Sequence, residues 1–102
     1  MEVVITTKAQ FRLAEIHKHY SEEATPEKAT EIVNQIIDRA LSLDKLANRG
    51  RIDEDLKSLG KSHRYILERH YKIIYRVEDK TVYVTDVFSN WQHPDKKIKR
   101  NR

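Results

Sequence analysis

The chain has 102 residues, of which 38% are hydrophobic and 35% are charged. This length fits one domain with a modest core. The composition is polar for a globular domain, but the chain lacks the like-charge blocks and the Pro and Gly enrichment of a disordered one, so we expect it to fold. The absence of cysteine excludes disulfides and thiolate zinc sites, and no apolar segment is long enough for a membrane span or a signal peptide core. We therefore expect a cytoplasmic protein that makes no contact with a membrane.

The net charge of +4 is distributed unevenly along the chain. Residues 1–48 hold 6 Lys or Arg against 8 Asp or Glu, whereas residues 49–102 hold 14 against 8, so the halves carry −2 and +6. Such a split favours an anionic partner, whether this is a nucleic acid, an acidic protein or a phosphate-rich surface. Lys and Arg that serve only solubility would give the same totals, so that alternative stays open.

The first half of the chain predicts a short strand followed by two helices. Residues 3–5 are β-prone, and Thr7 with Gln10 forms a capping-box pair that starts a helix. Pro26 behind Thr25 predicts the start of the second helix. The apolar positions at helical spacing are Ala9, Leu13, Ile16 and Tyr20 in the first helix, and Ala29, Ile32, Val33, Ile36, Ile37, Ala40 and Leu41 in the second. Two such amphipathic helices predict a helical hairpin that packs on a sheet.

The second half predicts an antiparallel sheet. Residues 53–62 are polar enough for a surface loop, and residues 64–67 are typical of a strand. Residues 71–77 and 81–88 are two β-rich segments separated only by the polar residues 78–80, which predicts a hairpin. The strand alternation puts Tyr71, Ile73, Tyr75 and Val77 on one face and Lys72, Ile74 and Arg76 on the other. We expect the stripe of the second helix to pack on the first of these faces, and the second face to be cationic.

The expected fold is therefore α+β, with an N-terminal strand, a helical hairpin and a three-stranded antiparallel sheet, in the order β-α-α-β-β-β. Residues 1–93 are expected to form a single domain. Residues 94–102 contain five Lys or Arg and one Asp, and we expect them to form a basic C-terminal tail or a short terminal helix.

These elements, in this order, resemble the RelE/ParE superfamily of toxins from bacterial type II toxin–antitoxin systems. The resemblance covers nearly the whole chain and rests on Ala9, Leu13, Ile16 and Tyr20, on Gly60 with Arg64, and on residues 71–77 and 86–94. Some members of the superfamily cut messenger RNA in the ribosomal A site, and others inhibit DNA gyrase without cutting anything. The resemblance implies a cognate antitoxin as partner, DNA gyrase or the ribosome and its mRNA as target, and no small-molecule cofactor.

The nuclease branch implies a set of basic and titratable side chains. Metal-independent RNA cleavage needs a base, an acid and cations that stabilise the charge on the phosphorane. Arg64 and Lys72 match two of the basic positions that the resemblance implies, and we expect them on adjacent strands with their head groups on one surface. His93 is the candidate acid, because imidazole titrates near working pH. The other titratable groups in or beside the strands are His63, Glu68 and His70.

The remaining basic positions of the nuclease pattern are not matched. Trp91 stands where many of the relatives have an arginine after the last strand, and the second lysine of the nuclease pattern falls at or near Ile66. The loss of one transition-state donor typically costs roughly 3 to 4 kcal/mol, so this departure favours an inhibitor over an enzyme. Trp91 is instead a candidate for stacking on a base.

The sequence thus favours a growth-arresting toxin that inhibits DNA gyrase in the manner of ParE. Its candidate nucleic-acid or target-binding residues are Arg76, Asn90, Trp91 and Gln92. The first alternative is a ribosome-dependent, metal-independent mRNA endoribonuclease that uses Arg64, Lys72 and His93. The second alternative is a basic RNA-binding module, although the chain has no RNA-binding signature motif. No metal site is expected, because the histidines are not spaced as a ligand set.

Overall fold

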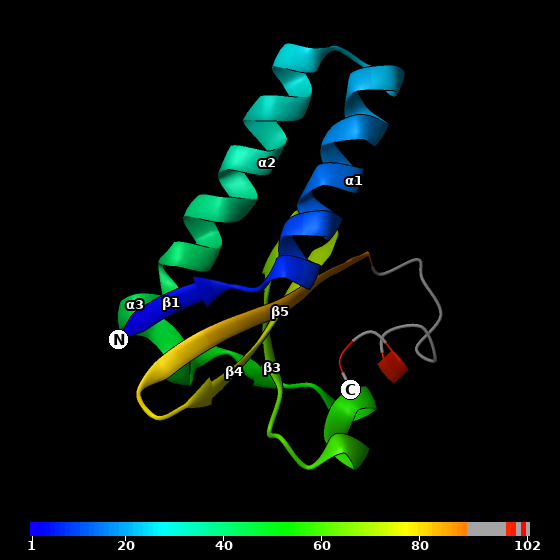
Figure 1. The fold of residues 1–102 in the computed structure, drawn as a ribbon. Coiled ribbons are helices and arrows are strands. Elements are labelled where there is room, and N and C mark those ends of the chain that lie inside the picture. The colour runs from blue at the N-terminus through cyan, green and yellow to red at the C-terminus, as the bar shows by residue number, and fades with distance from the viewer. Residues whose placement is uncertain (90–97, 100, 102) are drawn as a thin grey trace.

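The computed structural model describes residues 1–89, 98, 99 and 101. A twisted sheet forms one layer, and a helical hairpin stands on one of its faces (Figure 1). The elements in chain order are β1 (Glu2–Ile5), α1 (Thr7–Glu23), α2 (Pro26–Leu41), α3 (Leu43–Leu46), the 3-10 helix η1 (Ala47–Arg49), β2 (Arg51–Ile52), the 3-10 helix η2 (Glu54–Leu59), β3 (Arg64–Glu68), β4 (Tyr71–Glu78) and β5 (Thr81–Ser89). The α+β class and the helical hairpin are confirmed.

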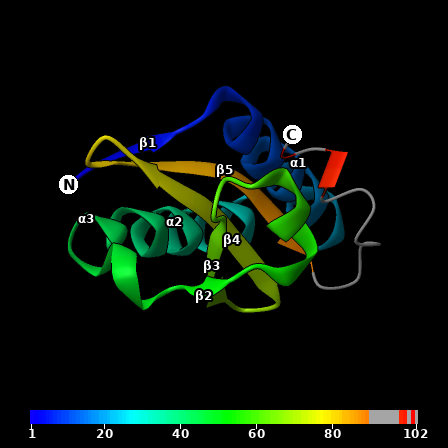
Figure 2. The ribbon, with the colours of Figure 1, turned by 90° about the horizontal axis from the view of Figure 1, so that it is seen from below.

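The sheet has five strands in the order β1-β5-β4-β3-β2, with β1 and β2 at opposite edges (Figure 2). Strands β3, β4 and β5 are antiparallel, as expected. Strand β1 pairs in parallel with β5, and the two-residue β2 pairs with β3. The expectation of three strands was therefore too low. A two-residue strand shows no alternation in the sequence, and the pairing of β1 depends on where the helical hairpin returns the chain.

The first helix begins one residue earlier than the sequence predicted. Thr6, not Thr7, is the N-cap, and its hydroxyl oxygen accepts a hydrogen bond from the N–H of Ala9 at 3.2 Å. The backbone of Thr6 stays extended because its N–H and its hydroxyl both donate to the Val84 carbonyl of β5, at 3.1 and 3.0 Å. The pairing of β1 with β5 thus extends to the cap and sets where α1 begins.

The main core lies between the helical hairpin and the sheet. Helix α2 begins behind its Thr25 cap, as expected, and buries Ile32, Ile36 and Ala40 against Ile73 and Tyr75 of β4 and the residues around them. This packing confirms the predicted stripe of α2 except at its last position, because the side chain of Leu41 is 47% exposed.

The expected core position Val77 is an exception, because its side chain is 41% exposed. It lies beside the β4–β5 pair next to the hairpin turn, where Glu78 pairs with Thr81. The alternation placed Val77 on the correct face but not under the helices.

A second, smaller core lies on the other face of the sheet, where Leu56 packs against Ile74 and Phe88. Leu56 belongs to η2, so residues 53–62 do not form the surface loop that their polarity suggested. Leu56 and Leu59 are three residues apart, and a 3-10 helix has three residues per turn, so both side chains lie on its sheet-facing side. The buried residues of this segment also include Asp53, which is 2% exposed.

Candidate functional site

Two basic side chains of β4 lie over tyrosine rings on the face of the sheet away from the helical hairpin, here called the open face. The Nζ atom of Lys72 is 4.4 Å from the centroid of the Tyr65 ring, and Cζ of Arg76 is 4.8 Å from the centroid of the Tyr83 ring. Such cation–π contacts hold long basic side chains in place while their charge stays at the surface. The prediction that Lys72 and Arg76 share one face is confirmed.

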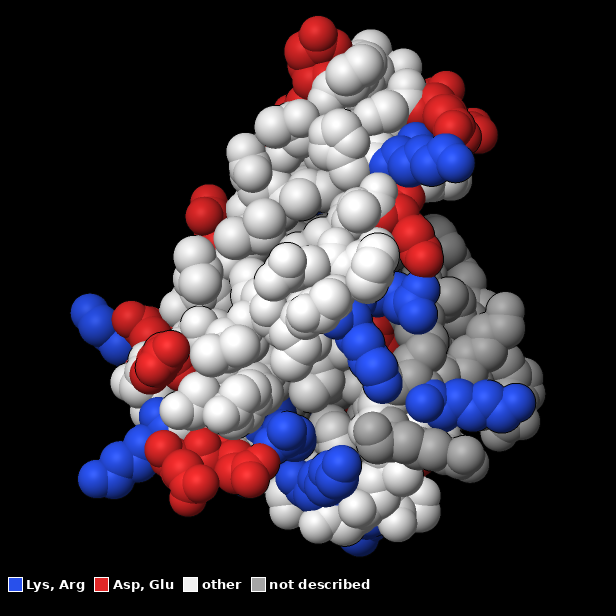
Figure 3. Space-filling view, in the orientation of Figure 1, with Lys and Arg blue, Asp and Glu red and all other residues white. Residues whose placement is uncertain are grey.

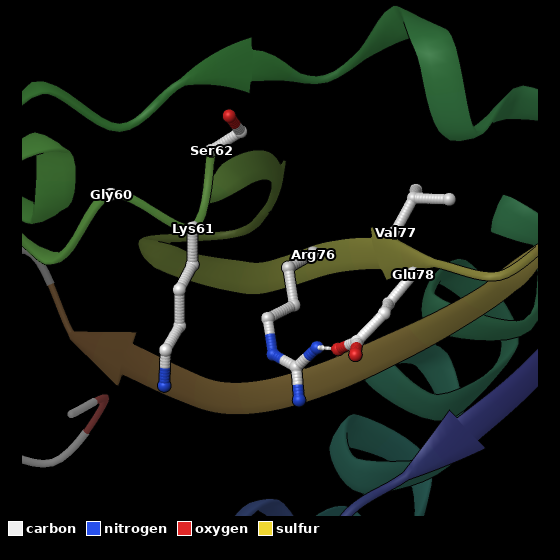
Figure 4. A pocket seen from close by; sticks show the side chains of 6 residues that line it. All are labelled: Gly60, Lys61, Ser62, Arg76, Val77 and Glu78. Carbon is white, nitrogen blue, oxygen red and sulfur yellow. Dashed lines mark hydrogen bonds and ion pairs between the residues drawn. The ribbon is translucent and has the colours of Figure 1, made fainter.

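A pocket of about 530 Å³ opens beside Arg76, where the segment before β3 passes the end of β4 (Figure 4). Its lining residues are Gly60, Lys61, Ser62, Arg76, Val77 and Glu78. The side chains of Lys61 and Arg76 run side by side in the same direction, and Arg76 forms an ion pair with Glu78. Gly60 and Ser62 have φ angles of 67° and 54°, so the backbone turns sharply on both sides of Lys61. We call this feature the Lys61–Arg76 pocket. Lys61 was not predicted as a site residue, because its only local signal in the sequence is the neighbouring Gly60.

A buried histidine lies close to this pocket. His63 is 2% exposed, and neither of its ring nitrogens has a hydrogen-bond partner within the described residues. Burial lowers the pKa of His63, the positive charges of Arg76 and Lys61 lower it further, and Asp53 raises it by a smaller amount. The ring is therefore neutral at neutral pH, and the site holds its positive charge at Lys61 and Arg76.

Arg64 lies on the helix-covered face of the sheet. The register between β3 and β4 places Arg64 opposite Tyr75 and Lys72 opposite Leu67. Arg64 and Leu67 are three residues apart on one strand, so their side chains point to opposite faces. The prediction that Arg64 and Lys72 share one cationic surface was therefore wrong. The sequence predicts alternation within each strand, but not the register between strands.

The Arg64 side chain is part of a hydrogen-bond network that holds the chain between η1 and β2 against the sheet. Its Nη1 donates to the Gly50 carbonyl at 2.8 Å, and the Gly50 N–H donates to the Tyr75 hydroxyl at 3.0 Å. The Tyr75 hydroxyl in turn donates to the Ala47 carbonyl. Burial raises the pKa of Tyr75, against the opposing effects of the Gly50 N–H and Arg64, so this hydroxyl keeps its proton. The contacts of Arg64 are structural.

Two other titratable groups named in the sequence analysis lie away from Lys72. Glu68 is opposite Tyr71, on the helix-covered face. His70 follows the strand, and its Nε2 is 3.5 Å from the Tyr20 hydroxyl. Neither group is placed with Lys72 as an acid or a base.

The rest of the predicted site residues, Asn90, Trp91, Gln92 and His93, lie outside the described residues. Farther along the chain, Asn101 is 5% exposed and contacts the open face. Its Nδ2 donates to the buried carboxylate of Asp86 at 3.0 Å, and its Oδ1 accepts from Thr85 at 2.6 Å. Asp86 also lies 4.0 Å from Nε of Arg12. At least this part of the basic C-terminal segment therefore packs on the sheet.

A second pocket, of about 260 Å³, combines three arginines with apolar side chains. It is lined by Arg39, Arg49, Arg51, Tyr65, Ile66 and Leu67, and we call it the arginine-rimmed groove. Arg39 donates from Nε to the Leu67 carbonyl at 3.3 Å, while the Leu67 side chain is 50% exposed. The groove thus offers positive charge and an apolar anchor point together.

The surface charge follows the split seen in the sequence. In Figure 3, acidic side chains mark the tip of the helical hairpin, and basic side chains are more numerous in the half of the molecule that holds the sheet. Neither a cluster of three or more metal-ligating side chains nor a helix able to span a membrane is found in the described part of the chain.

Comparison with known proteins finds a matching family and matching solved structures. The family described as the ParE toxin of the type II toxin–antitoxin system ParDE matches residues 3–93. Among solved structures, a chain from the chromosomal ParDE toxin–antitoxin system of P. aeruginosa superimposes with a TM-score of 0.77 and 29% sequence identity, over 87% of this chain and 95% of that chain. None of the curated proteins matches significantly.

Proposed function

Because the chain belongs to the ParE toxin family of type II toxin–antitoxin systems, we propose that it arrests growth by inhibiting DNA gyrase. In this proposal the toxin binds its target and performs no chemistry of its own. Lys72 and Arg76 of the open face contact the target. Asn90, Trp91 and Gln92 stay sequence-based candidates for the same contact.

One observation carries the preference for inhibition over RNA cleavage, namely the separation of Arg64 from Lys72. Phosphorane stabilisation requires cations that converge on one phosphate. Lys72 lies on the open face, whereas Arg64 lies on the covered face and donates to the Gly50 carbonyl. Arg64 therefore cannot supply a second positive charge to an active site that contains Lys72, because the two side chains lie on opposite faces of the sheet.

We further propose that the arginine-rimmed groove receives the acidic segment of a cognate antitoxin. A toxin that harms its own cell has to be masked, and a disordered acidic segment that folds on binding needs both charge complementarity and apolar anchors. The groove offers Arg39, Arg49 and Arg51 for the acidic residues and Leu67 for an apolar anchor.

Pulse labelling after induction in bacterial cells tests the choice of target. Inhibition of gyrase stops the incorporation of labelled thymidine first and induces the DNA damage response, with protein synthesis falling later. An mRNA endonuclease stops the incorporation of labelled amino acids first, and this result would contradict the proposal. A variant with Ile36→Asp, which we expect to be unfolded, controls for effects of expression alone.

Association kinetics with the product of a neighbouring gene test the groove. Charge steers association and apolar anchors set dissociation. We expect Arg51→Ala to slow association and to weaken its dependence on salt, and Leu67→Ala mainly to speed dissociation. Salt-independent association would contradict this placement of the antitoxin.

A further inference from the structure

We propose that the Lys61–Arg76 pocket binds a phosphate of a nucleic-acid backbone. We also propose that Glu78 lowers the affinity for this phosphate, because it pairs with Arg76 when no phosphate is bound. The binding itself does not depend on the target of the toxin. The further statement that the bound nucleic acid is the DNA engaged by gyrase rests on the function proposed above.

The two basic side chains are arranged for one shared anion. Lys61 and Arg76 come from segments 15 positions apart, and their side chains run in parallel beside β4 (Figure 4). An ammonium group offers three donors and a guanidinium group five, and a phosphate oxygen accepts from both. Only Nη1 of Arg76 is engaged by Glu78, which leaves other guanidinium donors for a second anion.

The ion pair between Arg76 and Glu78 is weak enough to yield to a phosphate. The Glu78 side chain is 60% exposed, and exposed ion pairs contribute little to stability because water and salt screen them. Arg76 is also held by its contact with Tyr83, so its position does not depend on Glu78.

The positive potential of the pocket reaches the protein interior despite Glu78. The charges of Arg76 and Lys61 both lower the pKa of the buried His63.

Lys72 lies four residues from Arg76 on the same face of β4, which is about 13 Å along the strand, so one nucleic-acid strand can contact both positions.

The composition of the pocket favours a phosphate over an acidic peptide. Peptides that become ordered on binding need apolar anchors to offset the lost conformational entropy. The side chains that point into this region are those of Lys61, Arg76 and Glu78, whereas Val77 points away from them. The apolar anchor lies instead in the arginine-rimmed groove, at Leu67.

Fluorescence anisotropy with the purified full chain tests this inference. The probes are a short labelled DNA duplex and a labelled single-stranded RNA of equal length, each titrated at salt concentrations between roughly 50 and 200 mM. We expect Lys61→Ala and Arg76→Ala each to weaken binding on the order of tenfold near 0.1 M salt and to reduce the slope of log K against log salt by about 1. The double variant Lys18→Ala, Lys45→Ala removes two positive charges from the helices, twice the charge lost in either single variant, and should still bind almost as the wild type does.

Two further variants separate binding from folding. Arg76→Lys keeps the charge and should restore most of the affinity lost in Arg76→Ala, and Glu78→Gln should bind severalfold more tightly than the wild type. Circular dichroism melts show which variants are folded. Equal affinity of the wild type and the folded Lys61→Ala and Arg76→Ala variants would overturn the proposal. Displacement of the probe by poly-glutamate at matched charge, with no preference for nucleic acid, would overturn it in favour of a peptide site.

The two probes and a parallel supercoiling assay distinguish the sources of failure. Stronger binding to DNA than to RNA supports DNA as the physiological ligand, and the reverse result removes the link to gyrase but keeps the phosphate site. If the wild type binds DNA through Lys61 and Arg76 but leaves gyrase unaffected, the proposed function fails and the site stands. If the Lys61→Ala, Arg76→Ala variant inhibits gyrase and binds DNA as the wild type does, the phosphate site and the target contact of Arg76 both fail, while gyrase inhibition itself stands.

Discussion

The two faces of the sheet use basic residues in different ways. On the helix-covered face, Arg64 donates to the Gly50 carbonyl and belongs to a network that includes the fully buried Tyr75. On the open face, Lys72 and Arg76 lie over tyrosine rings with their charge at the surface. Residues of one chemical type thus serve the fold on one face and are available to a partner on the other. The difference is decided by strand register, which assigns each side chain to a face.

The largest expected effect on the covered face is that of Ile36→Asp, because Ile36 is 1% exposed in the core under α2. A buried, unpaired carboxylate costs several kcal/mol against a total stability of about 5 to 15 kcal/mol, so we expect the variant to be unfolded. Leu41→Asp is the matched control on the same helix, since Leu41 is 47% exposed, and it should melt close to the wild type. Circular dichroism measures both, and a wild-type melting temperature for Ile36→Asp would show that the covered face is not the core.

A smaller loss is expected from Gly50→Ala. A Cβ atom on Gly50 would lie 2.0 Å from the hydroxyl oxygen of Tyr75, whose side chain is fully buried. We expect a decrease in the free energy of unfolding of about 2 to 3 kcal/mol, measured by urea denaturation. The control is Gly60→Ala, where the added Cβ meets no atom within 4 Å but φ is +67°, so the cost should be about 1 kcal/mol. Equal losses in the two variants would remove the reason given for glycine at position 50.

Arg64→Ala and Lys72→Ala compare the two faces directly. The first change leaves the Gly50 carbonyl without its charged donor and should cost about 1 to 3 kcal/mol of unfolding free energy. The second removes an accessible cation–π contact and should cost about 0.5 to 1 kcal/mol. Urea denaturation of both proteins provides the test. If Lys72→Ala were the more destabilising change, the assignment of a structural role to Arg64 and a surface role to Lys72 would be reversed.

The smallest expected effect is a pH dependence that comes from His63. Its pKa in the folded state lies below the usual value of 6.5, so the unfolded chain binds more protons at pH values below that. The stability that His63 contributes is therefore complete above about pH 6.5 and is lost as the pH falls through the lower pKa of the folded state. Melting curves at pH 7 and below should show this loss, and His63→Gln should show a shallower one. An unchanged pH dependence in His63→Gln would assign the loss to other groups.

Much of the fold could be predicted because its signals are local. The stripe of α2, the proline behind Thr25 and the strand alternation around Ile73 each depend on a few neighbouring residues. The N-cap of α1 is Thr6 rather than the predicted Thr7, because a hydrogen bond to Val84, far away in the sequence, keeps Thr6 extended. The missed 3-10 helix depends on a three-residue period that only Leu56 and Leu59 carry.

The candidate site was harder to predict because it depends on contacts between distant segments. Arg64 and Lys72 were correctly placed on adjacent strands. Whether their side chains share a face depends on the register between the strands, which the sequence of neither strand determines. Lys61 joins Arg76 only because the backbone turns at Gly60 and Ser62. The left-handed conformation of Ser62 has no reliable signal in the sequence, since serine seldom adopts it.

The most direct test of the central claim is a supercoiling assay with purified gyrase and relaxed plasmid, run in parallel with a translation extract whose mRNA is mapped by primer extension. We expect the purified chain to inhibit supercoiling and to leave the mRNA intact, with Lys72→Ala weakening inhibition and Arg64→Lys retaining it. Cleavage of the mRNA with undisturbed gyrase would contradict the account and would assign Lys72 to an active site.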